Sequence, residues 1–266
     1  MDKHTYFWCL IIVAMTFFFI GVYKNIAMKI GYILWVGNKD QDREPSLMNV
    51  LRLLPARRTL IDEAVLQRRI KQRSEFLWTR HSLIFFGFVI IFALDLFLTF
   101  AGHYVHHYFH IDYFMYGTGK GVLKFGMELS GMMLLIGLTL GIVHRIVYAN
   151  AEKTYVSLNL LCLLWLATVT GFATESFRLA AQPNDALKGF SFIGGPISER
   201  LSMIPWDWER LADWIWSIHA TITAAFLAYI PFSKFVHIFA APLGRSITQN
   251  GNYGIQKRQK ISDGLL

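Results

Sequence analysis

Long apolar runs alternate with polar, charged segments along the chain. Five runs stand out, at about residues 5–23 (extendable to 35), 82–101, 121–144, 155–175 and 212–231. Each is close to the roughly 20 residues that a helix needs to cross a bilayer. Because the backbone has no water to bond in lipid, such runs form helices, and they are too long for the strands of a membrane barrel. The pattern predicts an all-α integral membrane bundle of five helices, folded as one domain over residues 1–266. The first run lacks a small-residue cleavage site, so we expect a retained helix rather than a signal peptide.

Basic residues are distributed unevenly between these runs. The segment 36–80 carries ten Lys and Arg residues, and the part of the chain after the fifth run carries five more. The connections near 102–120 and 176–211 carry little net positive charge. Because basic loops stay on the cytoplasmic side, we expect the N-terminus outside, with a cytoplasmic segment at 36–80 and a cytoplasmic tail at 243–266. The formal net charge of +8 then reflects topology and attraction to anionic lipid, not nucleic-acid binding.

Two histidines of the last apolar segment, His219 and His237, have an informative spacing. They are 18 residues apart, which is five whole turns of an α-helix, so both imidazoles project from one face. The separation is about 27 Å along the axis, close to the roughly 30 Å hydrocarbon core. This spacing favours a helix that offers one haem ligand toward each leaflet. The alternative is two unrelated interfacial histidines, and Pro231 between them can kink the helix and spoil the register.

The depth of the other histidines suggests how they pair. His81 begins the second run at the same predicted surface where His237 ends the fifth, so these two match as the ligands of one haem b. For His219 the first choice of partner is His103, which returns to nearly the face of His81 if the helix continues that far. The two cysteines lie within apolar runs and form no Cys-x-x-Cys motif. Any haem, one or two per chain, is therefore expected to be held non-covalently by histidine.

Three stretches resemble a known family of membrane cytochrome b subunits. They are AYIPFSKFVHIFAAPL at 228–243, HSLIFFGF at 81–88 and TGFATESFR at 170–178. They resemble the gamma chains of respiratory nitrate reductase, and more closely the branch serving heterodisulfide-reductase-like and sulfite-reductase-linked menaquinol complexes. The resemblance spans about 75–243. It implies a haem b subunit of the prokaryotic cytoplasmic membrane that exchanges electrons between menaquinone and a cytoplasmic iron–sulfur partner. One position departs: nitrate reductase gamma chains have a second haem histidine where this chain has Ile91, which puts the ligation of the outer haem in question.

Several polar residues could serve such a function. Asp95 and Glu128 lie within apolar runs, where a carboxylate is costly, and are candidate acceptors of the protons released by a quinol. For Asp95 the structural alternative is a bond to a neighbouring helix or to His219. The pair Glu175–Arg178 is more simply an ion pair at a helix end. Candidate partners for haem propionates lie at the depth of the inner haem: Arg80, Arg145 and Lys234.

Two further features leave alternatives open. Four glycines of the third run, at 126, 131, 137 and 141, either permit close helix packing or leave room for a flat macrocycle. The charged segment 36–80 suits docking of a soluble subunit or contact with anionic lipid. Competing functions are a haem-free membrane anchor for a redox subunit and a small transporter that uses Asp95 and Glu128. A transporter usually shows an internal repeat, and this sequence shows none.

Overall fold

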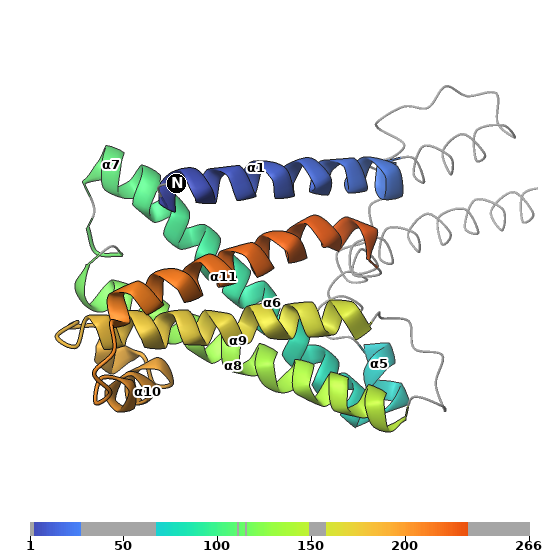
Figure 1. The fold of residues 1–266 in the computed structure, drawn as a ribbon. Helices are drawn as coiled ribbons and strands as arrows, with labels where there is room; N and C mark the ends of the chain where they lie inside the picture. The colour runs from blue at the N-terminus through green and yellow to red at the C-terminus, as the bar shows by residue number, and fades with distance from the viewer. Residues whose placement is uncertain (1–2, 28–67, 111, 115, 149–157, 234–266) are drawn as a thin grey trace, which may run out of the picture. The chain divides into compact units, whose positions relative to one another are not determined.

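The computed structural model describes residues 3–27, 68–110, 112–114, 116–148 and 158–233, and all regular structure in these ranges is helical. The chain separates into two compact units, one of Met1–Ile12 with Phe76–Leu227 and one of Val13–Glu75 with Ala228–Leu266. The five long helices are α1 (Lys3–Val22), α6 (Glu75–Phe100), α8 (Gly117–Val147), α9 (Leu158–Ala181) and α11 (Trp208–Tyr229) (Figure 1). Five helices of the described residues are long and apolar enough to cross a membrane, which matches the five predicted runs in number.

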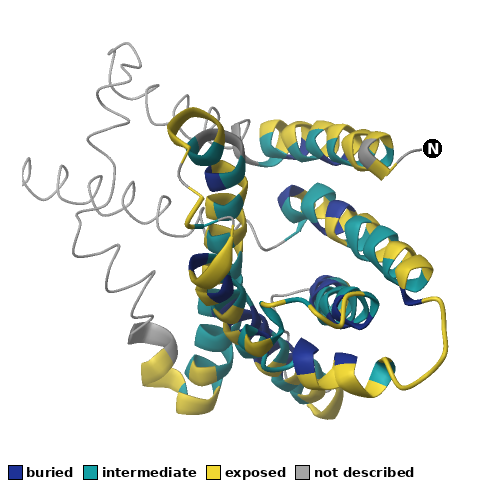
Figure 2. Ribbon diagram, turned by 90° about the vertical axis from the view of Figure 1, so that its left-hand side faces the viewer, coloured by how far each residue is buried: buried dark blue, intermediate teal, exposed yellow. Residues whose placement is uncertain are grey.

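Close packing of α8 against its neighbours forms the core of the larger unit. Helices α8 and α9 run side by side (Figure 1), and Leu134 and Leu138 of α8 and Leu160 and Leu164 of α9 are buried. Helix α6, by contrast, buries only Gly87. Most of its large side chains are exposed or half-buried, as expected of a helix that lies in lipid or against a partner. In Figure 2 most of the helical surface is coloured as exposed or intermediate.

Two glycines show how α6 and α8 meet. A Cβ atom on Gly87 would lie 2.7 Å from the backbone nitrogen of Leu134, and one on Gly137 would lie 2.9 Å from that of Ile84. At these two positions only glycine lets the backbones approach so closely. Gly141 is different, because the nearest atoms to its Cβ position are side-chain carbons at 3.8 Å. Close packing therefore accounts for Gly137, while Gly141 leaves ordinary space.

The second long helix differs from its prediction at both ends. It begins at Glu75, so His81 lies within the helix rather than at its start. At its other end it passes into a π-helical turn, Ala101–Val105, followed by α7 (His106–Phe109). A π turn holds more residues than an α turn, so the α-helical periodicity counted from His81 does not extend to His103. The helix does continue as far as His103, now through a π turn, so the predicted face of His103 stays a prediction, and its side chain lies outside the described part.

The last long helix is interrupted at Pro231. Regular α-helix ends at Tyr229, and a 3-10 turn, Ile230–Phe232, follows. Proline has no N–H to donate and its ring clashes with the preceding turn, so an unbroken α-helix through this point is unfavourable. The α-helical register counted from His219 is therefore broken before Ser233, and the placement of His237 stays a prediction. His237 and Lys234 lie outside the described residues.

The smaller unit is described in three short parts. The second half of α1 continues into a π-helical turn, Tyr23–Ala27, and α5 covers Arg68–Arg73. Asn25 donates through Nδ2 to the carbonyl oxygen of Pro231 at 3.0 Å. A Cβ on Gly21 would lie 2.7 Å from Cβ of Pro231, so the 3-10 turn packs tightly on this part of α1. Most of the predicted cytoplasmic segment 36–80 and all of the tail 243–266 lie outside the described residues.

Candidate functional site

The imidazole of His219 is held by helix α9. Its Nδ1 lies 3.1 Å from Oγ1 of Thr170. That hydroxyl is also 2.8 Å from the carbonyl oxygen of Leu166, to which it donates its one proton. A hydroxyl that donates there can accept from a ring N–H, so the contact fits a His219 protonated at Nδ1, whose ring also bonds the backbone of Ala167. Such a hydrogen bond to the opposite ring nitrogen is the usual way in which a protein orients a histidine ligand.

A glycine of α9 makes room for this ring. A Cβ on Gly171 would lie 3.3 Å from Cε1 of His219, closer than ordinary contact. Both residues line a cavity of about 260 Å³ between four of the long helices, which we call the His219 cavity. Its lining residues are Ile91 of α6; Lys124, Met127, Glu128 and Gly131 of α8; Ala167, Thr168, Gly171, Phe172, Thr174 and Glu175 of α9; Ser191; and His219 of α11.

The shape and lining of this cavity limit what it can hold. Its lining on α9 extends from Ala167 to Glu175, about 12 Å of helix. Its volume is below the roughly 300–1,000 Å³ of pockets that enclose drug-sized ligands. The cavity therefore suits a small ring system such as the head group of a quinone. Its ionisable groups, apart from His219, are those of Lys124, Glu128 and Glu175.

Glu128 anchors the short helix α10 (Gly194–Leu201). Its carboxylate is buried and accepts hydrogen bonds from the hydroxyl of Ser191, from the N–H of Ile193 at 2.7 Å and from the N–H of Gly194 at 3.1 Å. Negative charge at a helix N-terminus is favourable because the orphan N–H groups point toward it. The proton-acceptor role expected for Glu128 stays a prediction, and these contacts give the carboxylate a structural task that the sequence did not reveal.

Asp95 lies on α6 near the same histidine. Its carboxylate and the imidazole of His219 are close enough to interact electrostatically. The side chain is exposed in the isolated chain. The sequence left two roles for Asp95, a proton acceptor or a structural partner of His219. The structure places Asp95 near His219, as the structural role requires. Its proton-acceptor role stays a prediction.

Four charged residues near the α10 end of the larger unit form a connected group, which we call the ionic cluster. Glu175 accepts from Nζ of Lys124 at 2.8 Å and from Nε of Arg178 at 2.9 Å. Arg178 also donates to Oδ2 of Asp185 at 2.8 Å, and Lys124 lies 4.0 Å from the same oxygen. The expected Glu175–Arg178 ion pair is thus confirmed. The sequence reasoning missed Lys124 and Asp185, although a lysine inside an apolar run is costly and is itself a signal.

Asp185 forms the outer end of the ionic cluster. Burial raises the pKa of Asp185, but the N–H of Leu187 and the guanidinium of Arg178 outweigh it and hold that pKa below its ordinary value. Asp185 also lines a second cavity of about 650 Å³, the Lys120 cavity, whose rim residues at 182–184 are exposed. Its lining residues are Lys120, Lys124, Arg178, Gln182, Pro183, Asn184, Asp185 and Leu187. Lys124 lines both cavities, so the ionic cluster lies between the His219 cavity and the Lys120 cavity.

The opposite end of the larger unit holds His81, Arg80 and Arg145. One guanidinium nitrogen of Arg145, NH1, is buried and has no hydrogen-bond partner among the described residues. The side chain of Arg80 lies against Gly141, with Cδ 3.8 Å from its Cβ position. His144 stacks between Phe76 and Tyr148, at centroid distances of 5.6 and 4.8 Å. A buried N–H without a partner is costly, which makes Arg145 a candidate to pair with an anionic group.

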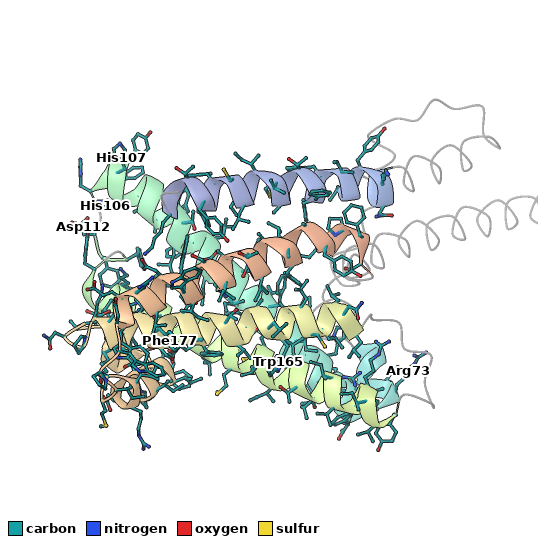
Figure 3. All side chains as sticks on the ribbon, viewed as in Figure 1. Arg73, His106, His107, Asp112, Trp165 and Phe177 are labelled. Atoms are coloured by element: carbon teal, nitrogen blue, oxygen red, sulfur yellow. The ribbon has the colours of Figure 1, made fainter. Side chains whose placement is uncertain are left out.

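The histidines after α6 form no metal site that the described residues reveal. His106 bonds through Nδ1 to Oδ1 of Asp112 at 2.6 Å, and His107 is exposed (Figure 3). In the described ranges no group of three or more His, Cys, Asp or Glu side chains is placed to hold a metal ion.

Comparison with known proteins gives one consistent similarity. The chain is similar to one subunit of the dihydromethanophenazine:CoB–CoM heterodisulfide reductase of Methanosarcina thermophila, with 26% identity over 205 residues, covering 74% of this chain and 68% of the relative. The corresponding subunits of Methanosarcina acetivorans and Methanosarcina mazei are also 26% identical, over 200 residues each. No family model matches, and no solved structure matches. The chain is thus a distant homologue of a subunit of a redox complex, which confirms the heterodisulfide-reductase part of the expected resemblance.

Proposed function

We propose that this chain is the haem b membrane subunit of a respiratory redox complex, passing electrons between a membrane-dissolved quinone and an iron–sulfur partner on the cytoplasmic side. The observation that carries the proposal is His219, a histidine inside a long apolar helix, which is oriented by Thr170 of α9 and lines a cavity between the helices. The similarity to a reductase subunit named for the lipid-soluble donor dihydromethanophenazine supports it. Haem b would supply one-electron transfer between the two-electron carrier and the partner.

The residues at the His81 end fit an inner haem. His81 and His237 are the proposed ligands, and Arg80, Arg145 and Lys234 are the proposed partners of the propionates. The unpaired NH1 of Arg145 supports this assignment, because a carboxylate would satisfy a buried guanidinium nitrogen.

The residues near His219 fit a second haem less completely. The contact with Thr170 orients the ring of His219 as a second-sphere partner orients a ligand, and His103 remains its proposed partner. Ile91, which stands where nitrate reductase gamma chains have a histidine, lines the His219 cavity with an apolar side chain. One or two haems per chain are therefore both consistent with the proposal.

The His219 cavity is the proposed site of the carrier's ring. Menaquinone is the carrier implied by the sequence resemblance, and the relatives' name implies a phenazine. Both are flat rings that exchange two electrons and two protons. Asp95 and Glu128 are the acceptors first proposed for these protons, on the ground that carboxylates inside membrane spans usually have a function.

The orientation and the partner follow from charge. The basic segment 36–80 and the tail would face the cytoplasm of a prokaryotic cell, with the N-terminus outside, and would contact anionic lipid and the iron–sulfur subunit. The His81 end would then be the cytoplasmic one, and the α10 end would face outward. A haem-free anchor remains the alternative function.

The visible spectrum of the purified chain tests the proposal. We expect a bis-histidine haem b spectrum that is reduced by a menaquinol analogue. His81→Ala and His219→Ala should each lower the haem content, and His107→Ala, at an exposed position, should leave it unchanged. A chain that folds and binds its partner without any haem absorbance would instead establish the anchor.

A further inference from the structure

The His219 cavity contains one carboxylate whose contacts lead out of it. The carboxylate of Glu128 is occupied by three donors at the start of α10. Glu175 lines the same cavity, but its partners are Lys124 and Arg178, which also line the Lys120 cavity. Of the carboxylates that line the His219 cavity, Glu175 is therefore the one connected to the solvent side.

We propose, resting on the function proposed above, that Glu175 is the catalytic proton acceptor for the carrier and that the ionic cluster releases the proton into the Lys120 cavity. In each half-reaction one O–H bond of the hydroquinone breaks. Its proton binds to a carboxylate oxygen of Glu175, and one electron goes to the haem b of the subunit. Glu175 then passes the proton to water in the Lys120 cavity. Two such half-reactions yield the quinone, two electrons and two released protons.

The cluster has the charges that such a transfer requires. A carboxylate paired with two cations is a poor base if protonation leaves both cations unpaired. Here Asp185 lies 2.8 Å from Arg178 and 4.0 Å from Lys124, so a second carboxylate is in reach of both cations when Glu175 is neutral. The N–H of Leu187 holds Asp185 in place at 2.8 Å.

The change of charge also gives the transfer a direction. At rest two cations and two carboxylates make the cluster neutral. Protonation of Glu175 leaves it with a net charge of +1, which favours loss of the proton. The other charged groups around the site are Glu128 on α8, whose charge is compensated by the start of α10, and Lys120, whose charge lies on the solvent side. A positive charge on that side disfavours the return of the proton.

The test uses the full-length, haem-loaded chain and a menaquinol analogue, with haem reduction followed by absorbance in a stopped-flow instrument. Glu175→Gln should slow reduction by roughly 10²–10⁴-fold, the range of a lost general base. Added formate, a small proton carrier, should restore part of the rate. Asp185→Asn should slow reduction less. Glu199→Gln is the matched control, since this α10 carboxylate is 66% exposed and paired with Lys188 at 3.6 Å.

Glu175→Asp guards against a folding defect, because it keeps the charge that Lys124 and Arg178 require and should retain more activity than Glu175→Gln. If the wild-type chain is not reduced by the hydroquinone, the proposed function fails. If the wild type is reduced and Glu175→Gln matches it, the proton role of Glu175 is refuted. A slow Glu175→Gln that keeps the wild-type pH profile and does not respond to formate would also refute it, leaving Glu175 a packing residue.

Discussion

The contact between α6 and α8 offers a sharp test of the structure, because two glycines of α8 have different amounts of space around their Cβ positions. Gly137 and Gly141 lie four residues apart within α8. A Cβ on Gly137 would meet Ile84 at 2.8 Å at Cγ1 and at 2.9 Å at its backbone nitrogen. A Cβ on Gly141 would meet only side-chain carbons at 3.8 Å. Gly137→Ala should therefore destabilise the chain, and Gly141→Ala should not.

The magnitude follows from the required movement. Ordinary contact begins at 3.4 Å, so Gly137→Ala needs a local separation of about 0.6 Å (3.4 − 2.8), and backbone atoms are among those that must move. Overpacking of this kind costs typically 1–3 kcal/mol. Alanine also gains about 1 kcal/mol of helix propensity over glycine. This gain is common to both variants, so the difference between them reports the clash of about 1–3 kcal/mol alone.

Thermal unfolding in mild detergent measures this difference. For a chain of this size each kcal/mol corresponds to roughly 2–4 °C in Tm. We expect Gly137→Ala to have a lower Tm than Gly141→Ala, by roughly 2–4 °C for each kcal/mol that the clash costs. Gly87→Ala should behave like Gly137→Ala, because its Cβ would lie 2.7 Å from the backbone of Leu134. Equal Tm values for Gly137→Ala and Gly141→Ala would show that α6 and α8 do not cross at these residues.

Three further predictions concern single side chains. Glu128→Gln keeps the shape but loses charge-assisted hydrogen bonds, each worth about 1.5–3 kcal/mol, so limited proteolysis near α10 should accelerate relative to Glu199→Gln; equal cleavage would contradict the anchoring role. Arg145→Met removes the unpaired guanidinium, so apo-chain stability should hold or rise while haem retention falls; unchanged haem content would oppose the propionate assignment. The lowered pKa of Asp185 means that its contribution to stability is present above its unfolded pKa of about 3.9 and is lost as pH falls through the folded value. Asp185→Asn should abolish that acid dependence of Tm, and an identical pH profile in the variant would contradict this account.

Much of the fold could be predicted from the sequence because the bilayer imposes a strong constraint. Five apolar runs gave five helices, since no other structure satisfies the backbone in lipid. The predicted bounds were too short, as at Glu75 and Trp208, because helical hydrogen bonding continues past the apolar stretch into polar residues. The π turn after Phe100 could not be predicted, because the sequence analysis assumed a constant α-helical period.

The candidate site was less predictable, because its contacts join distant segments. The pair Glu175–Arg178 could be predicted since its members are three residues apart. Nothing local indicates that Glu128 meets Ser191, 63 residues later, or that Lys124 meets Glu175. A charged side chain in an apolar run is energetically costly, and the lysine and carboxylates in such runs did mark the site. Only the packed helices, however, show which charges compensate one another.

The two ends of the larger unit differ in how completely the protein satisfies its own charges, and this difference bears on where each reaction partner belongs. At the α10 end the carboxylates of Glu128, Glu175 and Asp185 all have donors supplied by the chain. At the His81 end a nitrogen of Arg145 is buried without one. A permanently bound anionic group is expected where the protein leaves a buried charge incomplete, since binding removes a standing cost. A transient carrier is expected where the charged groups of the site already have partners within the protein, because the site must remain stable each time the carrier leaves. We therefore propose the inner haem beside Arg145 and the exchangeable ring beside Glu175.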